Sequence, residues 1–80
     1  MIASQAVAQR IIRLCGERNL TINGLCVVSG ITQSTINDIV NGTTRNPGVA
    51  TIQKLCDGMN LSLREFFNHE LFDGLDPEIQ

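Results

Sequence analysis

The sequence predicts a single all-α domain of five helices, because apolar residues recur every three or four positions in five successive segments. No four-residue window alternates apolar and polar positions with β-branched side chains, so no strand is expected. The 80 residues, of which 42% are hydrophobic, can build one modest core but not a second. We therefore expect one domain over residues 1–80, with a compact part at 3–72 and an acidic tail at 73–80.

The first helix is expected over residues 3–18. Its apolar side is formed by Val7, Ile11, Leu14 and Cys15. The charged residues of this segment lie mostly away from that side, and they are Arg10, Arg13, Glu17 and Arg18.

Two short helices separated by a tight turn are expected over residues 21–42. Thr21 is a good N-cap for the first of them, and Gly30 can take the left-handed conformation that ends it. Ile31 is an apolar residue within the turn, so the turn should lie against the core. The buried face of this helix is expected to consist of Ile22, Leu25 and Cys26.

The second of these helices should begin after an N-cap at Thr32 and end at Asn41 and Gly42, before a polar loop over residues 43–48. Its buried stripe is expected to consist of Ile36, Ile39 and Val40. Its outer face would carry amides, a hydroxyl and a carboxylate, from Gln33, Ser34, Asn37, Asp38 and Asn41. The pair is typical of a helix-turn-helix motif, although amphipathic helices joined by glycine also occur in many small bundles.

The last two helices are expected at 49–58 and after residue 62. The first of them has an apolar side formed by Val49, Ile52, Leu55 and Cys56, and it ends at Gly58 and Asn60. Ser62 is an N-cap with Glu65 three residues later, which is the pattern of a capping box. The apolar pattern that follows is formed by Leu63, Phe66, Phe67, Leu71, Phe72 and Leu75.

Nothing in the residue pattern predicts a metal site or catalysis. The cysteines are odd in number, widely spaced and on expected buried stripes, so Cys15, Cys26 and Cys56 are interpreted as reduced core thiols. The single histidine, His69, has no neighbouring ligand and no nucleophile to serve, so we expect no metal, no cofactor and no enzyme activity. Without a long apolar run or a signal peptide pattern, a cytoplasmic protein without membrane association is expected.

The order of these elements resembles the λ-repressor and Cro type of helix-turn-helix domain, the XRE family. The resemblance covers residues 3–72 and is carried by Leu25, Cys26, Gly30, Ile31, Thr32, Ile36, Ile39, Asn41, Gly42 and Pro47, followed by Asn-Leu-Ser-Leu and Phe-Phe. It implies a five-helix DNA-binding domain that inserts the second helix of the motif into the major groove of double-stranded DNA, usually as a homodimer. The family usually has alanine at the position of Cys26, where cysteine is a slightly larger substitute.

The resemblance implies that the second helix of the motif reads bases, and its residue chemistry agrees. Gln33 can pair bidentately with adenine, and Ser34 can donate to or accept from most base edges. Asp38 can accept from cytosine but repels phosphate, so it ranks below these two. The full set of candidate base-reading residues is Thr32, Gln33, Ser34, Thr35, Asn37 and Asp38. The alternative for these polar residues is an ordinary solvated helix face.

Contacts to the DNA backbone are expected on either side of that helix. Thr21 and Asn23 begin the first helix of the motif, where free N–H groups and the helix dipole favour an anion. Ile22 departs from the polar residue that many relatives have at its position, which weakens the contact expected there. The second set of candidate phosphate ligands is Asn41, Thr43, Thr44 and Arg45, although Asn41 can also be a simple C-cap.

Charge argues against strong binding of DNA. The net charge is −2, but its two parts differ: residues 1–56 carry five basic against two acidic side chains, and residues 57–80 carry one against six. The acidity is therefore confined to the C-terminal part, which we expect to lie away from the groove. Only Arg45 falls in the segments expected to face DNA, so weak non-specific binding with a shallow salt dependence is predicted.

The C-terminal apolar residues predict a protein interface. We expect a homodimer through Phe66, Phe67, Leu71, Phe72 and Leu75, although Phe66 and Phe72 can instead close the core of one protomer. The leading function is a sequence-specific transcriptional regulator, a small repressor. The alternative is an antitoxin-like interaction module, in which this patch binds a partner protein and the helix-turn-helix regulates its own gene.

Overall fold

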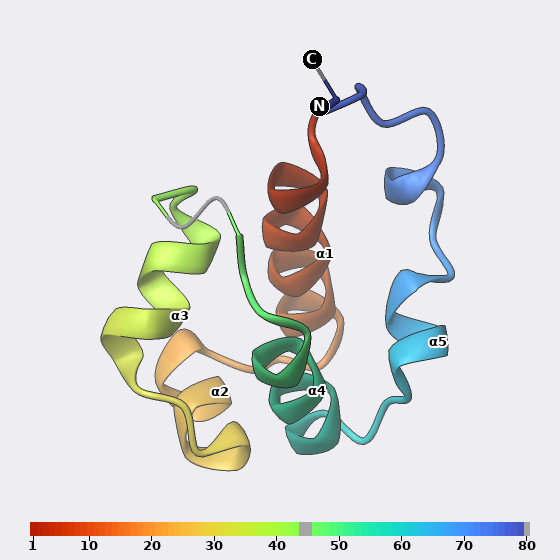
Figure 1. Ribbon diagram of the computed structural model, residues 1–80. Coiled ribbons are helices and arrows are strands. Elements are labelled where there is room, and N and C mark those ends of the chain that lie inside the picture. Colours follow the sequence, from red (N-terminus) through yellow and green to blue (C-terminus); the bar gives the residue numbers. More distant parts are fainter. Residues whose placement is uncertain (44–45, 80) are drawn as a thin grey trace.

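The computed structural model describes residues 1–43 and 46–79, and over these ranges it contains five α-helices, a short 3₁₀ helix and no strand. The α-helices are α1 (Ala3–Glu17), α2 (Ile22–Ser29), α3 (Gln33–Val40), α4 (Val49–Gly58) and α5 (Leu63–Phe67), and the 3₁₀ helix is η1 (Glu70–Phe72). In Figure 1, α1 runs through the middle, with α2 and α3 on one side and α5 with η1 on the other. The all-α, five-helix prediction is confirmed.

Local hydrogen bonds set the ends of the helices where the sequence predicts them. Thr21 Oγ1 accepts from the backbone N–H of Gly24 at 3.0 Å, and Gly30 ends α2 in the left-handed region with φ 71°. Ser62 Oγ accepts from the N–H of Glu65 at 3.0 Å, and the Glu65 carboxylate accepts from the N–H of Ser62 at 3.0 Å. These caps satisfy N–H groups that a helix leaves unpaired, so each turn is specified by neighbouring residues.

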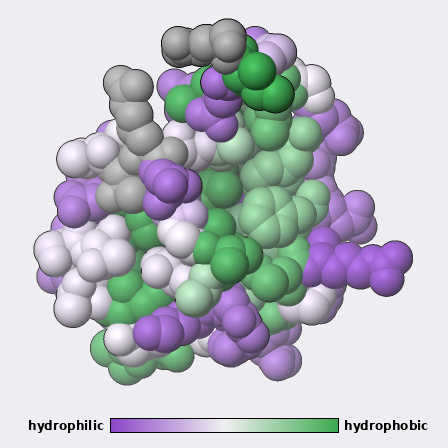
Figure 2. Space-filling model, in the orientation of Figure 1, coloured by the Kyte–Doolittle hydropathy of each residue, from purple (hydrophilic) through white to green (hydrophobic). Residues whose placement is uncertain are grey.

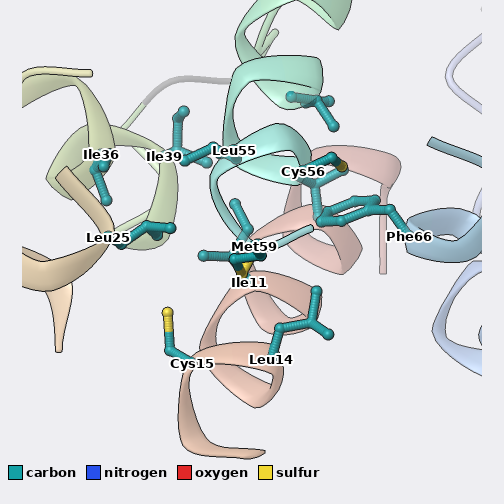
Figure 3. Close-up of a cluster of buried hydrophobic side chains, with 12 residues drawn as sticks. Ile11, Leu14, Cys15, Leu25, Ile36, Ile39, Leu55, Cys56, Met59 and Phe66 are labelled. Atoms are coloured by element: carbon teal, nitrogen blue, oxygen red, sulfur yellow. The ribbon is translucent and has the colours of Figure 1, made fainter. Parts of the chain in front are cut away.

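All five α-helices contribute side chains to one core (Figure 3). Leu25 of α2 and Ile36 of α3 are completely buried, and the half-buried Ile31 of the turn packs against the same cluster. α3 packs against α1, and α2 packs against both α3 and α4. The two motif helices are therefore fixed to the rest of the domain by their apolar sides. The rest of the buried hydrophobic cluster consists of Val7, Ile11, Leu14, Cys15, Ile39, Ile52, Leu55, Cys56, Met59 and Phe66.

Arg10 does not lie away from the core as its charge predicts, but is buried at the joint between α1 and α5. Its Nε donates to the carbonyl oxygen of Phe66 at 2.7 Å, and its Nη2 donates to that of Glu65 at 3.1 Å. The carbonyls at a helix C-terminus lack helical partners and carry partial negative charge, so they stabilise a cation. The aliphatic stem of arginine can be buried while its guanidinium makes these bonds.

Val49 belongs by its spacing to the apolar side of its helix, but its side chain is 66% exposed. Val49 is the first residue of α4, whereas Ile52, one turn later, is buried. The apolar stripe thus begins one turn before the helix reaches the core. Periodicity marks the side of a helix that faces inward, but it does not mark where along the helix the contact starts.

A close approach between backbones joins α2 to α4. A Cβ added to Gly58 would lie 2.8 Å from the carbonyl oxygen of Val28 and 3.0 Å from the Cα of Ser29. Real Cβ atoms do not come this near to backbone atoms, so a side chain here would push the helices apart. Gly58 therefore does more than end a helix, because it lets α4 pack directly against the end of α2.

The C-terminal segment folds back along α1. η1 packs against α1, and in Figure 1 the segment after η1 runs back to the start of the protein. The Met1 amine forms an ion pair with the carboxylate of Asp76 at 2.9 Å, and the N–H of Asp76 donates to the carbonyl oxygen of Met1 at 3.0 Å. The acidic segment expected to be a tail is thus held against the start of the protein at residue 76.

Candidate nucleic-acid interface

The outer face of α3 exposes the polar side chains that the sequence assigns to base reading. Gln33, Ser34, Thr35 and Asp38 are exposed, while Asn37 is half-buried and so presents less of its amide. Ile36 and Ile39, on the opposite side, are fully buried in the core. The helix is therefore held by its apolar side with its hydrogen-bonding side in solvent, which is the arrangement that insertion into a groove requires.

Hydroxyl groups surround the N-terminus of α3. Thr32 Oγ1 accepts from the N–H of Thr35 at 3.4 Å and donates to Thr35 Oγ1 at 2.9 Å, and it lies 3.4 Å from Ser34 Oγ. Thr32 is thus both the N-cap and the centre of a small hydroxyl cluster. Because its hydroxyl is engaged by its own helix, its methyl group is the part with most freedom to touch a base. Gln33 takes no part in this cluster, so its amide is uncommitted within the described residues.

The N-terminus of α2 has backbone N–H groups that its cap leaves free. Thr21 Oγ1 binds the N–H of Gly24, while no hydrogen bond among the described residues uses the N–H groups of Ile22 and Asn23. The Asn23 side chain is exposed, and the Ile22 side chain packs against the core. Two free donors and the positive end of the helix dipole remain for an anion here. Ile22 offers no polar side chain to such an anion, because it packs against the core.

Beyond α3, Asn41 and Thr43 are exposed, while Thr44 and Arg45 lie outside the described residues. The N–H of Asn41 donates to the carbonyl oxygen of Asn37 at 2.9 Å, and Gly42 follows with φ 77°. Asn41 therefore ends the helix through its backbone. Its side chain is exposed and makes no hydrogen bond recorded for residues 1–43 and 46–79, so both interpretations of Asn41 are compatible with the structure.

The structure reduces the number of cations that can meet a phosphate. Arg10 is buried, and Arg18 donates to the carbonyl oxygen of Met59 at 3.4 Å. Arg13 and Lys54 are exposed. Asp38 adds a negative charge to the outer face of α3 itself. Residues 1–56 therefore offer solvent fewer free cations than their count of basic side chains indicates.

The thiols are placed as structural side chains. Cys15 and Cys56 are buried and free, and burial raises the pKa of both thiols above the ordinary value. The Asp57 carboxylate raises the pKa of Cys56 further, while Arg18 partly offsets the rise at Cys15. A raised pKa lowers the fraction of reactive thiolate. Cys26 is half-buried and packs against the core.

Residues 1–43 and 46–79 contain no group of three histidine, cysteine or acidic side chains placed to hold a metal ion. Across the same residues, none of the helices has both the length and the apolar character needed to span a bilayer.

The five candidate dimer residues are not equally exposed. Phe66 is completely buried, and Figure 3 shows it inside the core. For this residue, the structure matches the alternative to a dimer contact, in which its side chain closes the core of one protomer. Phe72 is half-buried and packs against the same core, with its ring centroid 6.1 Å from that of Phe66. Leu71 and Leu75 are half-buried, and Phe67 is exposed.

Comparison with known proteins decides the family. A family model described as helix-turn-helix matches residues 9–66, which contain α2, the turn and α3 together with most of the supporting core. The chain belongs to the XRE-type helix-turn-helix family. A curated member from Bacillus subtilis (strain 168), the uncharacterized HTH-type transcriptional regulator RghRB, is 47% identical over 47 residues, or 59% of this chain. The chain covers 34% of the length of that relative.

A solved structure extends the likeness of this XRE-type domain to the whole fold. The crystal structure of the prophage Lp1 protein 11 matches with a TM-score of 0.78 at 31% sequence identity. The match covers 86% of this chain and 92% of the other. The resemblance seen in the sequence is confirmed by both kinds of comparison.

Proposed function

We propose that this XRE-type protein is a sequence-specific regulator of transcription that reads duplex DNA by inserting α3 into the major groove. The observation that carries the proposal is the two-sided character of α3: Ile36 and Ile39 are buried in the core, and Gln33, Ser34 and Thr35 are exposed. A helix held in this way projects its hydrogen-bonding side chains as a rigid unit. The curated relative, named as a transcriptional regulator, supports the same role.

Base reading is assigned first to Gln33 and Ser34, at the exposed N-terminal end of α3. The Gln33 amide offers a donor and an acceptor together, which matches the N6 and N7 positions of adenine. Thr32 and Thr35 contribute methyl groups for thymine. Asp38 accepts from cytosine, and the half-buried Asn37 contributes least among the candidates.

Phosphate contacts are assigned to the two ends of the motif. At the start of α2, Thr21, Asn23 and the free N–H groups would hold one strand, because a helix N-terminus attracts an anion. On the far side, Asn41, Thr43, Thr44 and Arg45 would hold the other. Since Arg10 is buried, few cations take part, and the salt dependence of binding should be shallow.

The regulator is proposed to act as a homodimer in the cytoplasm and to repress by occupying an operator with two-fold symmetry. A dimer would compensate for the weak electrostatic attraction of one motif, because two half-sites bind together. A second function is favoured by one observation, that Phe67 remains 39% exposed beside the acidic C-terminal segment. In that alternative, an antitoxin-like module binds a partner protein through this end and autoregulates through the motif.

Selection of bound sequences from random duplex DNA tests the main proposal. We expect one enriched site, and Gln33→Ala should weaken binding to it by about 1–3 kcal/mol while relaxing the preference at one base pair. Gln9→Ala is the matched control, because Gln9 is an exposed glutamine on α1, outside the motif. Absence of any enriched sequence, or equal effects of the two variants, would reject reading by α3.

A further inference from the structure

A shallow hollow of about 200 Å³ opens where α1, α4 and α5 meet. Its apolar lining includes Val7, Pro47, Ile52 and Phe67, and Glu78 lies at its lip. The surface in Figure 2 shows hydrophobic residues gathered over the middle of this face, framed by hydrophilic ones. Small-molecule pockets commonly enclose about 300–1,000 Å³, so this hollow is of a size to receive one or two apolar side chains rather than a cofactor.

Exposed apolar side chains surround the hollow. Phe67 is 39% exposed and forms part of its wall. Val49 is 66% exposed and lies one helical turn before Ile52, which lines the hollow, so both are on the same side of α4. Ile79 is 94% exposed and follows Glu78 directly. One face of the protomer therefore carries both an apolar hollow and the protruding side chains that can fill such a hollow.

Charges of opposite sign lie at two edges of this face. Arg64 is exposed and lies one turn before Phe67 on α5, and it is the only basic residue of residues 57–80. Glu78 is exposed at the other edge, beside Ala3 and Ser4 at the start of α1. The one ion pair recorded within residues 1–43 and 46–79 joins Met1 to Asp76, so among these residues neither Arg64 nor Glu78 has an ion-pair partner.

We propose that this hollow face, and not the Phe66–Leu75 segment as a whole, is where two copies of the chain pair. A two-fold interface presents the same patch from each copy, so each group must find its complement on the partner's identical surface. Here, protruding Val49 or Ile79 of one copy would enter the hollow of the other, and Arg64 of each would approach Glu78 of the other. The inference rests on the proposed dimeric binding of DNA and identifies the surface that creates the dimer.

Some of the residues that the sequence predicts for the dimer interface make contacts inside the protomer instead. Phe66 is buried and holds Arg10 through its carbonyl oxygen, and Phe72 packs on the core. Of the five, Phe67 alone is classed as exposed and also lines the hollow. The hollow face also includes Asn46 and Pro47, which lie between α3 and α4 in the chain, so pairing here would bring the partner against the segment that leads from α3 to α4.

Sedimentation equilibrium of the full chain over a wide range of concentration tests the proposal. We expect a reversible monomer–dimer equilibrium that Val49→Glu weakens about tenfold or more, because it places a charge against an apolar surface. Glutamate suits the first turn of α4, so folding should be retained. Val27→Glu is the matched control, since Val27 is 81% exposed on α2 and does not line the hollow; it should leave the equilibrium unchanged.

Exchange of the charges tests the pairing itself. Arg64→Glu and Glu78→Arg should each weaken the dimer, and the double variant should recover most of the loss, because opposite charges again face each other. A monomer at every concentration, a dimer that Val49→Glu and Val27→Glu affect equally, or a double variant no better than its parents would overturn the proposal. Selection of a half-site by a monomer in the same preparations would retain the proposed DNA reading while rejecting this interface.

Discussion

The helix-turn-helix and the C-terminal part of this protein are held in different ways. In the helix-turn-helix region, the bonds that shape the chain join close neighbours: Thr21 caps α2, Gly30 turns the chain, and Thr32 caps α3. At the C-terminal end, the decisive bonds cross the sequence. Arg10 reaches the carbonyl oxygens of Glu65 and Phe66, 55 and 56 positions away.

This difference separates the helix-turn-helix from the C-terminal part of the domain that supports it. The motif can present a fixed set of side chains because its own turns are locally determined, while its apolar sides and the end of α2, which packs on Gly58, depend on the rest of the fold. α5 has five residues, too few to be stable by itself, and its position depends on α1. Changes to the long-range bonds should therefore destabilise the fold more than changes to the caps.

The largest effect is expected from Arg10→Leu. This change removes the two Arg10 donors that bond to the end of α5, and it leaves the carbonyl oxygen of Phe66 without that partner in a buried place and that of Glu65 in a partly buried one. We expect a loss of about 2–4 kcal/mol in the free energy of unfolding, measured with urea. Arg13→Leu, an exposed arginine of the same helix, should change it by less than about 0.5 kcal/mol. Equal losses of unfolding free energy from the two variants would show that the bonds from Arg10 to α5 add no stability of their own.

A smaller effect is expected from Gly58→Ala, which tests the contact between the two regions. The new methyl group would meet the carbonyl oxygen of Val28 at 2.8 Å, so α2 and α4 must separate, at a cost of about 1–3 kcal/mol. Gly16→Ala is the matched control, because nothing lies within 4 Å of its Cβ and alanine is the better helix former. In thermal unfolding, Gly58→Ala should lower the midpoint temperature below that of the native protein, and Gly16→Ala should raise it. A higher midpoint for both variants would contradict the close approach.

The smallest effect is expected from the capping box of α5, because it is local and exposed. Hydrogen bonds from the Ser62 backbone and hydroxyl hold the pKa of Glu65 below its ordinary value. The contribution to stability is thus present above the ordinary pKa of glutamate and is lost as pH falls through the lowered value in the folded protein. Glu65→Gln keeps an acceptor without titrating, so the difference in unfolding free energy between the two proteins should change over that acidic range. A constant difference would mean that the box is not coupled to folding.

The sequence predicted the motif region well because its determinants are local. The N-caps at Thr21, Thr32 and Ser62 and the left-handed turn at Gly30 all follow from residues within a few positions, and the apolar stripes of α2 and α3 follow from periodicity. The comparisons confirm the family that these residues indicate.

The features that the sequence did not predict depend on contacts between residues that are far apart in the chain. No local pattern distinguishes Arg10, which bonds to α5, from Arg13, which is solvated, because both are basic residues on the same helix. Gly58 looks like an ordinary stop signal, and its second role depends on where α2 lies. For the residues proposed to read bases, sequence and structure agree on exposure, except that Asn37 is half-buried, and direct binding experiments must now assign their roles.

The inward placement of Arg10 also has a kinetic consequence. Proteins locate their sites by first adhering to arbitrary DNA through phosphate contacts and then sliding or hopping along it. A guanidinium bound to the end of α5 cannot contact phosphate in that search, and the exposed Asp38 carboxylate on α3, the helix proposed to read bases, would repel phosphate. We therefore expect slow capture of DNA and short residence on wrong sequences, so that occupancy of an operator depends on how long the correct complex lasts.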